Sequence, residues 1–273
     1  MSEKNRKFII LFICMNLIYL IFVFATKAFE NKSSELPIIT FKNDILTVSV
    51  DDSQEELLKG AIATDVEDGD ISKDIFVYSI STFDDDNTRT ITYAVFDSDN
   101  QMVTASRKLK YSDYSAPKFS STKSLINITL SGAIDSSYIQ ASSSVDGDIS
   151  NKISVSQTQQ SEYKTTYKYS VTDSTGTTSS LEITDEISLN SMFTNIDIEL
   201  KDYIIYVKKG TTINPRSYIQ NIHTSLGNQN ELKPYVNIET NYNSQKAGTY
   251  EVRYVLNRNN GDYGISKLII IVE

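Results

Sequence analysis

The segment RTITYAVFDSDNQ, residues 89–101, places Ile91, Tyr93 and Val95 at every second position and then ends in a run of turn-forming residues. Apolar residues that recur with a period of two are typical of a β-strand with one buried face. Asp, Ser and Asn favour tight turns because their side chains hydrogen-bond to the nearby backbone and Asn tolerates positive φ. The segment therefore predicts a strand that ends in a hairpin turn.

The same pattern occurs twice more, in TTYKYSVTDSTGT (residues 165–177) and TYEVRYVLNRNNGD (residues 249–262). Aligning the central tyrosines brings the turns into register. The aligned positions are Tyr93, Tyr169 and Tyr254; then Asp97, Asp173 and Arg258; then Asn100, Gly176 and Gly261. Gly or Asn at the last of these positions predicts a turn residue with positive φ.

A second motif confirms the register of the repeats. DGDISKDIFV (residues 68–77) matches DGDISNKISV (residues 146–155), and NELKPYVNI (residues 230–238) keeps the same apolar spacing. The shared apolar positions are Ile71, Ile149 and Leu232; Ile75, Ile153 and Val236; and Val77, Val155 and Ile238. Self-similarity of this kind is the signature of a repeat protein, and these positions are expected to be buried. The tetrapeptide SYIQ also occurs twice, at Ser137–Gln140 and Ser217–Gln220.

Each repeat of roughly 80 residues holds several short strand-like segments, which is typical of a β-sandwich. Early strands are expected in residues 44–50, 125–131 and 203–210, and closing strands in residues 106–111, 181–187 and 267–273. Ser53 and Glu56 have the spacing of a capping box and predict a short helical turn. The expected fold class is all-β, with three tandem β-sandwich modules at residues 35–115, 116–192 and 193–273.

The N-terminus differs from the rest of the chain. A basic segment, residues 1–7, precedes an apolar run at residues 8–25 that is long enough for a membrane helix. Basic residues favour the cytoplasmic side, so this pattern predicts a single-pass protein with its N-terminus in the cytoplasm, a linker at residues 26–34 and an extracellular C-terminus. The alternative is a cleaved signal peptide, with small residues in Val23-Phe24-Ala25, and a secreted product.

Charge and rare residues restrict the function. The chain has 273 residues and a net charge of −9; without residues 1–28, which hold four basic groups and one acid, the charge is −12. Nucleic-acid binding is not expected, because it depends on Lys and Arg that neutralise phosphates. His223 is the only histidine, and Cys14 lies in the apolar run, so neither disulfides nor a Cys–His catalytic pair is expected in the repeats. Catalysis is not expected.

The motifs A-x-D-x-x-D-G-D-I, then I-x-V, then Y-x-V-x-D-x-x-G resemble the bacterial immunoglobulin-like surface repeat family. Ala63 to Ile71 carry the first motif, and Tyr169 to Gly176 carry the last. The third repeat lacks the acidic motif. The family occurs in Gram-positive surface proteins and in some pesticidal crystal proteins. The resemblance implies an Ig-like fold and a cell-surface location, but not a specific activity, because such modules serve as spacers, adhesive tips or contact surfaces.

The acidic segment ATDVEDGDISKDIFV, residues 63–77, has two interpretations. Asp65, Glu67, Asp68 and Asp70 supply the hard oxygen ligands that calcium prefers, so a calcium site is one hypothesis. The other is a solvated acidic turn, since Asp-Gly is itself turn chemistry. The second repeat keeps two of these acids, at Asp146 and Asp148, and the third has only Glu231. What all three repeats share is the apolar set rather than the acids.

The expected function is that of a binding or structural protein. Membrane attachment through residues 8–25 would let a rod of three modules present its distal module, residues 193–273, to a protein or glycan. That module is rich in tyrosines, which suit such contacts but also fill cores: Tyr203, Tyr206, Tyr218, Tyr235, Tyr242, Tyr250, Tyr254 and Tyr263. The alternatives are a non-catalytic subunit of an envelope secretion or pilus-like assembly, and a carbohydrate-binding accessory protein.

Overall fold

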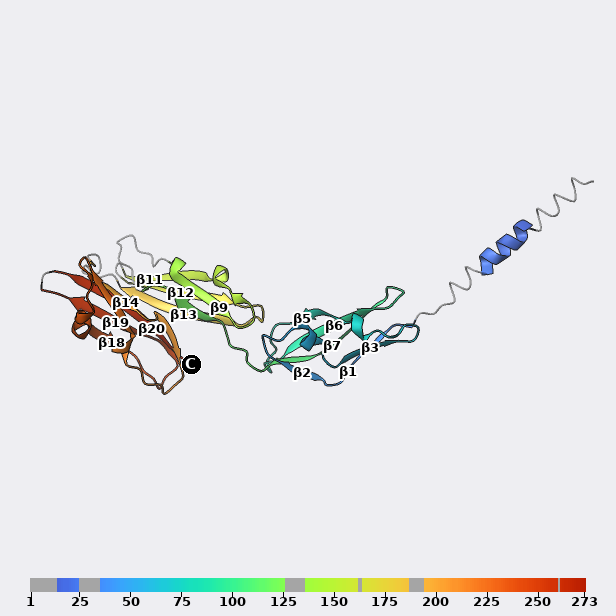
Figure 1. Ribbon diagram of the computed structural model, residues 1–273, viewed down its shortest axis with the longest axis horizontal. Coiled ribbons are helices and arrows are strands. Elements are labelled where there is room, and N and C mark those ends of the chain that lie inside the picture. Colours follow the sequence, from blue (N-terminus) through green and yellow to red (C-terminus); the bar gives the residue numbers. More distant parts are fainter. Residues whose placement is uncertain (1–13, 25–34, 126–135, 162–163, 187–193, 260) are drawn as a thin grey trace, which may run out of the picture. The chain divides into compact units, whose positions relative to one another are not determined.

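The computed structural model describes residues 14–24, 35–125, 136–161, 164–186, 194–259 and 261–273 (Figure 1). These residues form an all-β protein with a few short helices, as the sequence predicts. The chain divides into two compact units. The first comprises the described part of Met1–Val48, with Asp52–Ser81 and Thr88–Lys110, and the second comprises Ser49–Asp51, Thr82–Asn87 and Tyr111–Glu273.

Two sheets supply the strands of the first unit, with orders β1-β3-β4 and β2-β7-β6-β5. The strands are β1 (Ile38–Phe41), β2 (Ile45–Val48), β3 (Ala61–Asp65), β4 (Gly69–Asp70), β5 (Phe76–Ile80), β6 (Arg89–Phe96) and β7 (Met102–Tyr111). Helix α2 (Gln54–Leu58) and the 3-10 turn η1 (Ser72–Asp74) connect them. The predicted helical turn is therefore present, but Ser53 makes no side-chain cap, and the N–H of Glu56 binds the carbonyl oxygen of Ser53 instead.

A buried arginine lies in the core of the first unit. The guanidinium of Arg107 is 5.1 Å from the ring centres of both Phe41 and Tyr93. Its Nε donates to Tyr93 Oη (2.8 Å), and its Nη2 donates to the carbonyl oxygens of Leu57 (3.2 Å) and Lys59 (2.8 Å). A buried charge is tolerated only when it is hydrogen-bonded in this way. The guanidinium thus joins the α2 segment to β6 and β7.

Four sheets supply the strands of the second unit, with orders β10-β9-β8, β11-β12-β13, β14-β16-β17 and β15-β20-β19-β18. The strands are β8 (Lys118–Ser121), β9 (Ile139–Ser143), β10 (Gly147–Asp148), β11 (Ser154–Ser161), β12 (Lys164–Thr172), β13 (Thr178–Glu186), β14 (Asp197–Leu200), β15 (Ile204–Val207), β16 (Ile219–Thr224), β17 (Gly227–Asn228), β18 (Asn237–Thr240), β19 (Gly248–Asn257) and β20 (Tyr263–Val272). The helical turns are η2 (Ser136–Tyr138), η3 (Ser150–Lys152), η5 (Pro215–Tyr218) and η6 (Asn230–Tyr235). In this unit β15 pairs with β20 in parallel, and the other strand pairings within the sheets are antiparallel.

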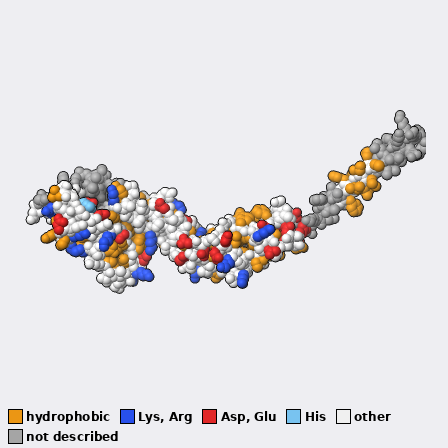
Figure 2. All heavy atoms as spheres, in the orientation of Figure 1, with side chains coloured by type: hydrophobic (Ala, Val, Ile, Leu, Met, Phe, Trp, Pro, Cys, Tyr) orange, Lys and Arg blue, Asp and Glu red, His pale blue; other side chains and the backbone are white. Residues whose placement is uncertain are grey.

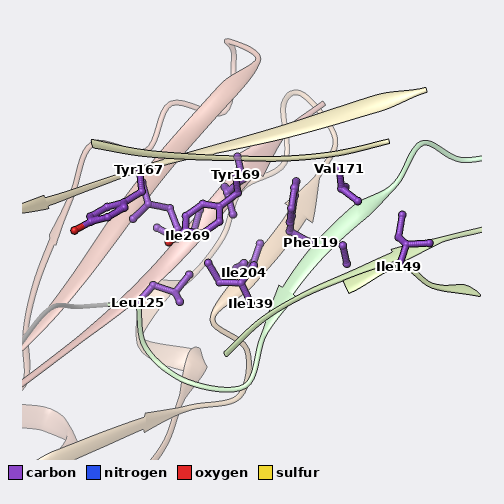
Figure 3. Close-up of a cluster of buried hydrophobic side chains, with 12 residues drawn as sticks. Phe119, Leu125, Ile139, Ile149, Tyr167, Tyr169, Val171, Ile204 and Ile269 are labelled. Atoms are coloured by element: carbon purple, nitrogen blue, oxygen red, sulfur yellow. The ribbon is translucent and has the colours of Figure 1, made fainter. Parts of the chain in front are cut away.

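One hydrophobic cluster of the second unit combines two of the predicted modules. Phe119, Ile139 and Tyr169 pack together with Ile204 from β15 and Ile269 from β20 (Figure 3). The neighbouring residues Leu268 and Ile270 face a separate cluster with Tyr254. Strand β20 is therefore buried on both faces, which explains why residues 268–272 are continuously apolar rather than alternating.

The residues that align the repeats occupy equivalent places. Tyr93, Tyr169 and Tyr254 are each fully buried. The predicted turn residues have positive φ, with 61° at Asn100, 83° at Gly176 and 89° at Gly261. Of the shared apolar positions, Ile71, Ile75, Ile149 and Val236 are buried, but Val155 is 46% exposed. The prediction that Val155 is buried is therefore wrong, whereas the equivalent residues Val77 and Ile238, which also lie on edge strands, are partly buried.

The prediction of a single-pass membrane protein is corrected by the structure. Residues 14–24 are helical. Within the described part of the chain, no helix is long and apolar enough to cross a membrane. The predicted segments 1–7 and 26–34, residues 8–13 and 25 of the predicted span, and residues 126–131 of an expected strand lie outside the described residues.

Candidate functional site

The acidic segment of the first unit forms the turn between β3 and β4. Asp65 Oδ1 accepts the backbone N–H groups of Glu67 (2.7 Å) and Asp68 (2.9 Å). Gly69 closes the turn with φ of +74°, a conformation that glycine adopts without the strain imposed by a Cβ. The segment is thus a turn stabilised by its own first carboxylate.

Asp68 and Asp70 accept hydrogen bonds from different serines. Asp68 Oδ2 accepts the N–H of Ser98 (2.7 Å) and so fastens the β3–β4 turn to the β6–β7 turn. Asp70 Oδ1 accepts the N–H (3.0 Å) and the hydroxyl (2.5 Å) of Ser72. These hydrogen bonds from Ser72 lower the pKa of Asp70. Ser72 Oγ in turn accepts the N–H of Ala63 (3.0 Å), which ties η1 to β3.

The second repeat reproduces this arrangement with its own residues. Asp146 Oδ2 accepts the N–H of Ser174 (2.7 Å), and Asp148 Oδ1 accepts the N–H of Ser150 (2.9 Å). Ser150 Oγ accepts the N–H of Ala141 (3.0 Å). The acids common to both repeats therefore have structural partners.

The two repeats differ at the aspartate that begins the second turn. In the second repeat Asp173 Oδ2 accepts the hydroxyls of Ser143 (3.2 Å) and Tyr114 (2.9 Å). In the first repeat Asp97 Oδ1 accepts the N–H of Gln101 (2.8 Å), but Asp97 Oδ2 and Gln101 Oε1 are buried without a hydrogen-bond partner among the described residues. The sequence pattern identified Asp97 only as a turn residue, and it gave no role to Gln101.

The four-acid calcium set stays a prediction. Asp65, Glu67, Asp68 and Asp70 lie on one turn, with Asp68 and Asp70 directed to different serines. Within the described residues, no three His, Cys, Asp or Glu side chains are grouped so that they could hold a metal ion. A cation at this turn would therefore need oxygen ligands of other kinds.

A second candidate site covers the outer face of the sheet β14-β16-β17. Glu199 Oε2 accepts Asn221 Nδ2 (2.7 Å) and lies 3.2 Å from His223 Nε2. Asn221 Oδ1 accepts the side-chain amides of Asn228 (3.3 Å) and Asn230 (3.2 Å). Hydrogen bonds from Asn221 and His223 lower the pKa of Glu199. Because Ile198 and Ile222 point into the core, these polar neighbours point outward.

Most tyrosines of the last repeat are partly or fully buried. Tyr254 is buried, and Tyr203, Tyr218, Tyr242 and Tyr250 pack against the core. Burial raises the pKa of Tyr206 to about 12. Tyr235 is the exposed exception, at 74%, and Leu226 in the β16–β17 turn is 80% exposed.

Charge on the second unit is mixed. On the face drawn in Figure 2, acidic and basic side chains are interspersed over its described residues. A nucleic-acid site would instead gather Lys and Arg on one surface. Among the described residues, the drawn face shows no such single-sign surface.

Neither a family model nor a curated protein matches this sequence. Solved structures with similarity include the M60 catalytic domain with CBM51-1 and CBM51-2 domains from Clostridium perfringens ZmpB (11% identity, 88% of this chain, 31% of that chain, TM-score 0.23). The structure of CBM51-2 in complex with GlcNAc and INT domains from the same protein is 20% identical, covers 50% of this chain and 30% of that chain, and has a TM-score of 0.22. Human CDH23 EC21-23 gives 9% identity, 87% and 100% coverage and a TM-score of 0.19.

The chain spans less than a third of the length of the first two structures. The function proposed below therefore rests on the residues of this chain.

Proposed function

We propose that the chain is a non-catalytic binding protein of three Ig-like modules, at residues 35–115, 116–192 and 193–273, whose last module binds a glycan. The three-module division is supported by the repeated tyrosine and turn pattern and by a pair of sheets in each predicted module. The observation that carries the binding proposal is the outward polar network of Glu199, Asn221, His223, Asn228 and Asn230.

The chemistry of this network suits sugar hydroxyls. Each asparagine amide has two donor hydrogens and a carbonyl acceptor, and a carboxylate has several acceptor positions. Glu199 and Asn221 already hold each other in place, so a ligand meets ordered groups with hydrogen-bonding capacity left over. Leu226, exposed at the end of the same sheet, adds an apolar contact for a sugar face. Preorganised polar groups beside an apolar residue are typical of small-molecule recognition.

A catalytic function for the same residues is less well supported. The His223–Glu199 pair has the spacing of a base and its orienting carboxylate. Nucleophilic catalysis also needs a nucleophile within hydrogen-bonding reach of the base. The hydrogen bond that the structure gives to the His223 ring goes to Glu199, so the pair acts as part of a surface network.

The test is binding of the full chain to a glycan array, followed by calorimetric titration with the best glycan. We expect Asn221→Ala combined with Asn228→Ala to reduce affinity by tenfold or more, since each lost hydrogen bond is worth about 1 kcal/mol. Asn237→Ala is the matched control, because Asn237 is exposed on the other sheet of the same module. Failure to bind any glycan, or equal affinity of the double variant, would refute the proposal.

A further inference from the structure

We infer that Asp65, Asp97 and Gln101 form a calcium site in the first unit, between the β3–β4 and β6–β7 turns. This inference is independent of glycan binding. It differs from the four-acid set on the single turn, because two of its three ligands belong to the other turn.

The carboxylate of Asp97 has one buried oxygen without a hydrogen-bond partner among the described residues. Asp97 is only 8% exposed, and this oxygen is its Oδ2. Gln101 Oε1, on the same turn, is buried without a partner as well. Burying a carboxylate oxygen without compensation is costly, so natural structures pair such groups with a donor or a metal ion. Two acceptor oxygens without a donor favour a cation.

The second repeat has a serine where the first repeat has Asp65. Asp65 pairs with Gly69 across its turn as Ser143 pairs with Gly147, so Asp65 occupies the place of Ser143. Ser143 donates its hydroxyl to Asp173, the counterpart of Asp97. A carboxylate at the same place accepts the two N–H groups of its turn, as Ser143 does, but has no proton to donate. The first repeat therefore has a carboxylate, Asp65, at the position from which Ser143 of the second repeat donates its hydroxyl to the equivalent aspartate.

Two facing carboxylates repel each other unless a cation or a shared proton lies between them. The third repeat has neither acid, since Thr224 pairs with Gly227 and Arg258 replaces the aspartate of the other turn. Arg258 Nη1 instead lies 3.6 Å from the carboxylate of Asp262. Acids at both of these positions thus occur in the first repeat alone, which makes the other two repeats internal controls.

The oxygen ligands of this site suit calcium. Calcium binds six to eight oxygen ligands in flexible geometry and accepts carboxylate, amide and water oxygens together. Two carboxylates and one amide oxygen match this preference, with water completing the shell. Such a set is not a cluster of three acids, which agrees with the absence of one among the described residues. With only two charges, the affinity should fall near 0.1–1 mM, roughly the range of extracellular calcium modules.

The test is calorimetric titration of the full chain with calcium chloride, together with thermal unfolding in calcium and in chelator. We expect binding with a Kd of roughly 0.1–1 mM and a calcium-dependent rise in the Tm of the first unit. Asp97→Asn should abolish both effects. Asp65→Ser should also abolish binding, yet raise the Tm in chelator, because a hydroxyl would then donate to Asp97 as Ser143 does to Asp173.

Asp173→Asn is the matched control in the second repeat and should leave the calcium response unchanged. Glu67→Gln and Asp70→Asn should likewise retain binding, which separates this site from the four-acid set. Absence of calcium binding would overturn the inference. So would loss of binding in Glu67→Gln and Asp70→Asn with retention in Asp97→Asn. A calcium-independent rise in Tm on mild acidification, without calcium binding, would assign a shared proton to the pair instead.

Discussion

At the scale of single residues, one carboxylate fastens two turns in each of the first two repeats. Asp146 accepts the N–H (2.7 Å) and the hydroxyl (2.5 Å) of Ser174, and it lies 3.3 Å from Lys152 Nζ. Hydrogen bonds to charged groups contribute about 1.5–3 kcal/mol each. The side chain thus connects the hairpin β9–β10 to the hairpin β12–β13, which belongs to a different sheet.

We expect Asp146→Ala to lower the free energy of unfolding by about 2–3 kcal/mol, because the Ser174 N–H loses its acceptor. Urea denaturation of the full chain measures this loss. Glu182→Ala is the control, since Glu182 is exposed on β13 and lies only 3.7 Å from Lys168 in a surface ion pair. Such pairs contribute about 0–1 kcal/mol. A loss below 0.5 kcal/mol in Asp146→Ala would show that the connection is not stabilising.

The same carboxylate predicts a response to acid. Partial burial tends to raise the pKa of Asp146, but the hydrogen bonds from Ser174 and the Lys152 ammonium outweigh it, so the pKa lies below its ordinary value of 3.8. A carboxyl group whose pKa is lower in the folded state stabilises the fold fully at a pH above its pKa in the unfolded state. This contribution is lost as the pH falls through the pKa of the folded state. The urea concentration at the unfolding midpoint of the second unit should therefore decrease as the pH drops below about 4.

Asp146→Asn should remove part of this pH dependence, since the amide does not titrate. The comparison is made between the slopes of midpoint against pH from about pH 5 to about pH 3 for the two proteins. Equal slopes would mean that other carboxylates account for the acid response.

At the scale of elements, the 3-10 turns η1 and η3 are held by equivalent serines. Ser150 Oγ accepts the N–H of Ala141 and donates to Asp148 (2.6 Å), so it joins η3 to β9. We expect Ser150→Ala to destabilise the protein by about 1–2 kcal/mol, because a partly buried N–H loses its partner. Hydrogen exchange should accelerate at the amide of Ala141. Ser154→Ala, at an exposed serine on β11, is the control and should leave that amide protected.

Much of the element pattern follows from the sequence, because alternating apolar residues and turn-forming residues act locally. Tyr93, Tyr169 and Tyr254 and their following turns were predictable for this reason. The exposure of Val155 was not predictable, since a period-two pattern does not specify what packs over each face of a strand. The candidate sites were only partly predictable: Asp65 stood out by composition, whereas Gln101 and the Asn221 network depend on contacts between hairpins and strands.

At the scale of the whole molecule, the second and third repeats share part of one hydrophobic core. Phe119 N–H donates to Tyr206 Oη (2.6 Å), and Lys267 Nζ donates to the carbonyl oxygen of Thr184 (2.9 Å). Ile204 and Ile269 complete the core that contains Tyr169. A sequence repeat predicts a boundary near residue 193, but it carries no information on which faces of neighbouring modules pack together. Residues 111–273 are accordingly expected to unfold in one cooperative transition.

The shared core gives the last prediction. Ile269 belongs to the third repeat by sequence but packs with Tyr167, Tyr169 and Leu181 of the second (Figure 3). Replacing a buried Ile by Ala costs about 2–5 kcal/mol through lost contacts and a residual cavity. We expect Ile269→Ala to lower stability by this amount and to accelerate hydrogen exchange in β12 and β13, which lie in a different repeat.

Ile265→Ala is the matched control on the same strand, because Ile265 is half-buried and paired with Val255 on β19. It should have a smaller effect and leave β12 and β13 protected. If Ile269→Ala changed exchange only within β15, β19 and β20, the second and third repeats would be independent folding units. Accelerated exchange in β12 and β13 would instead show that two neighbouring repeats share their stability through one strand. The effect of a force or of ligand binding on the last repeat would then reach the repeat before it.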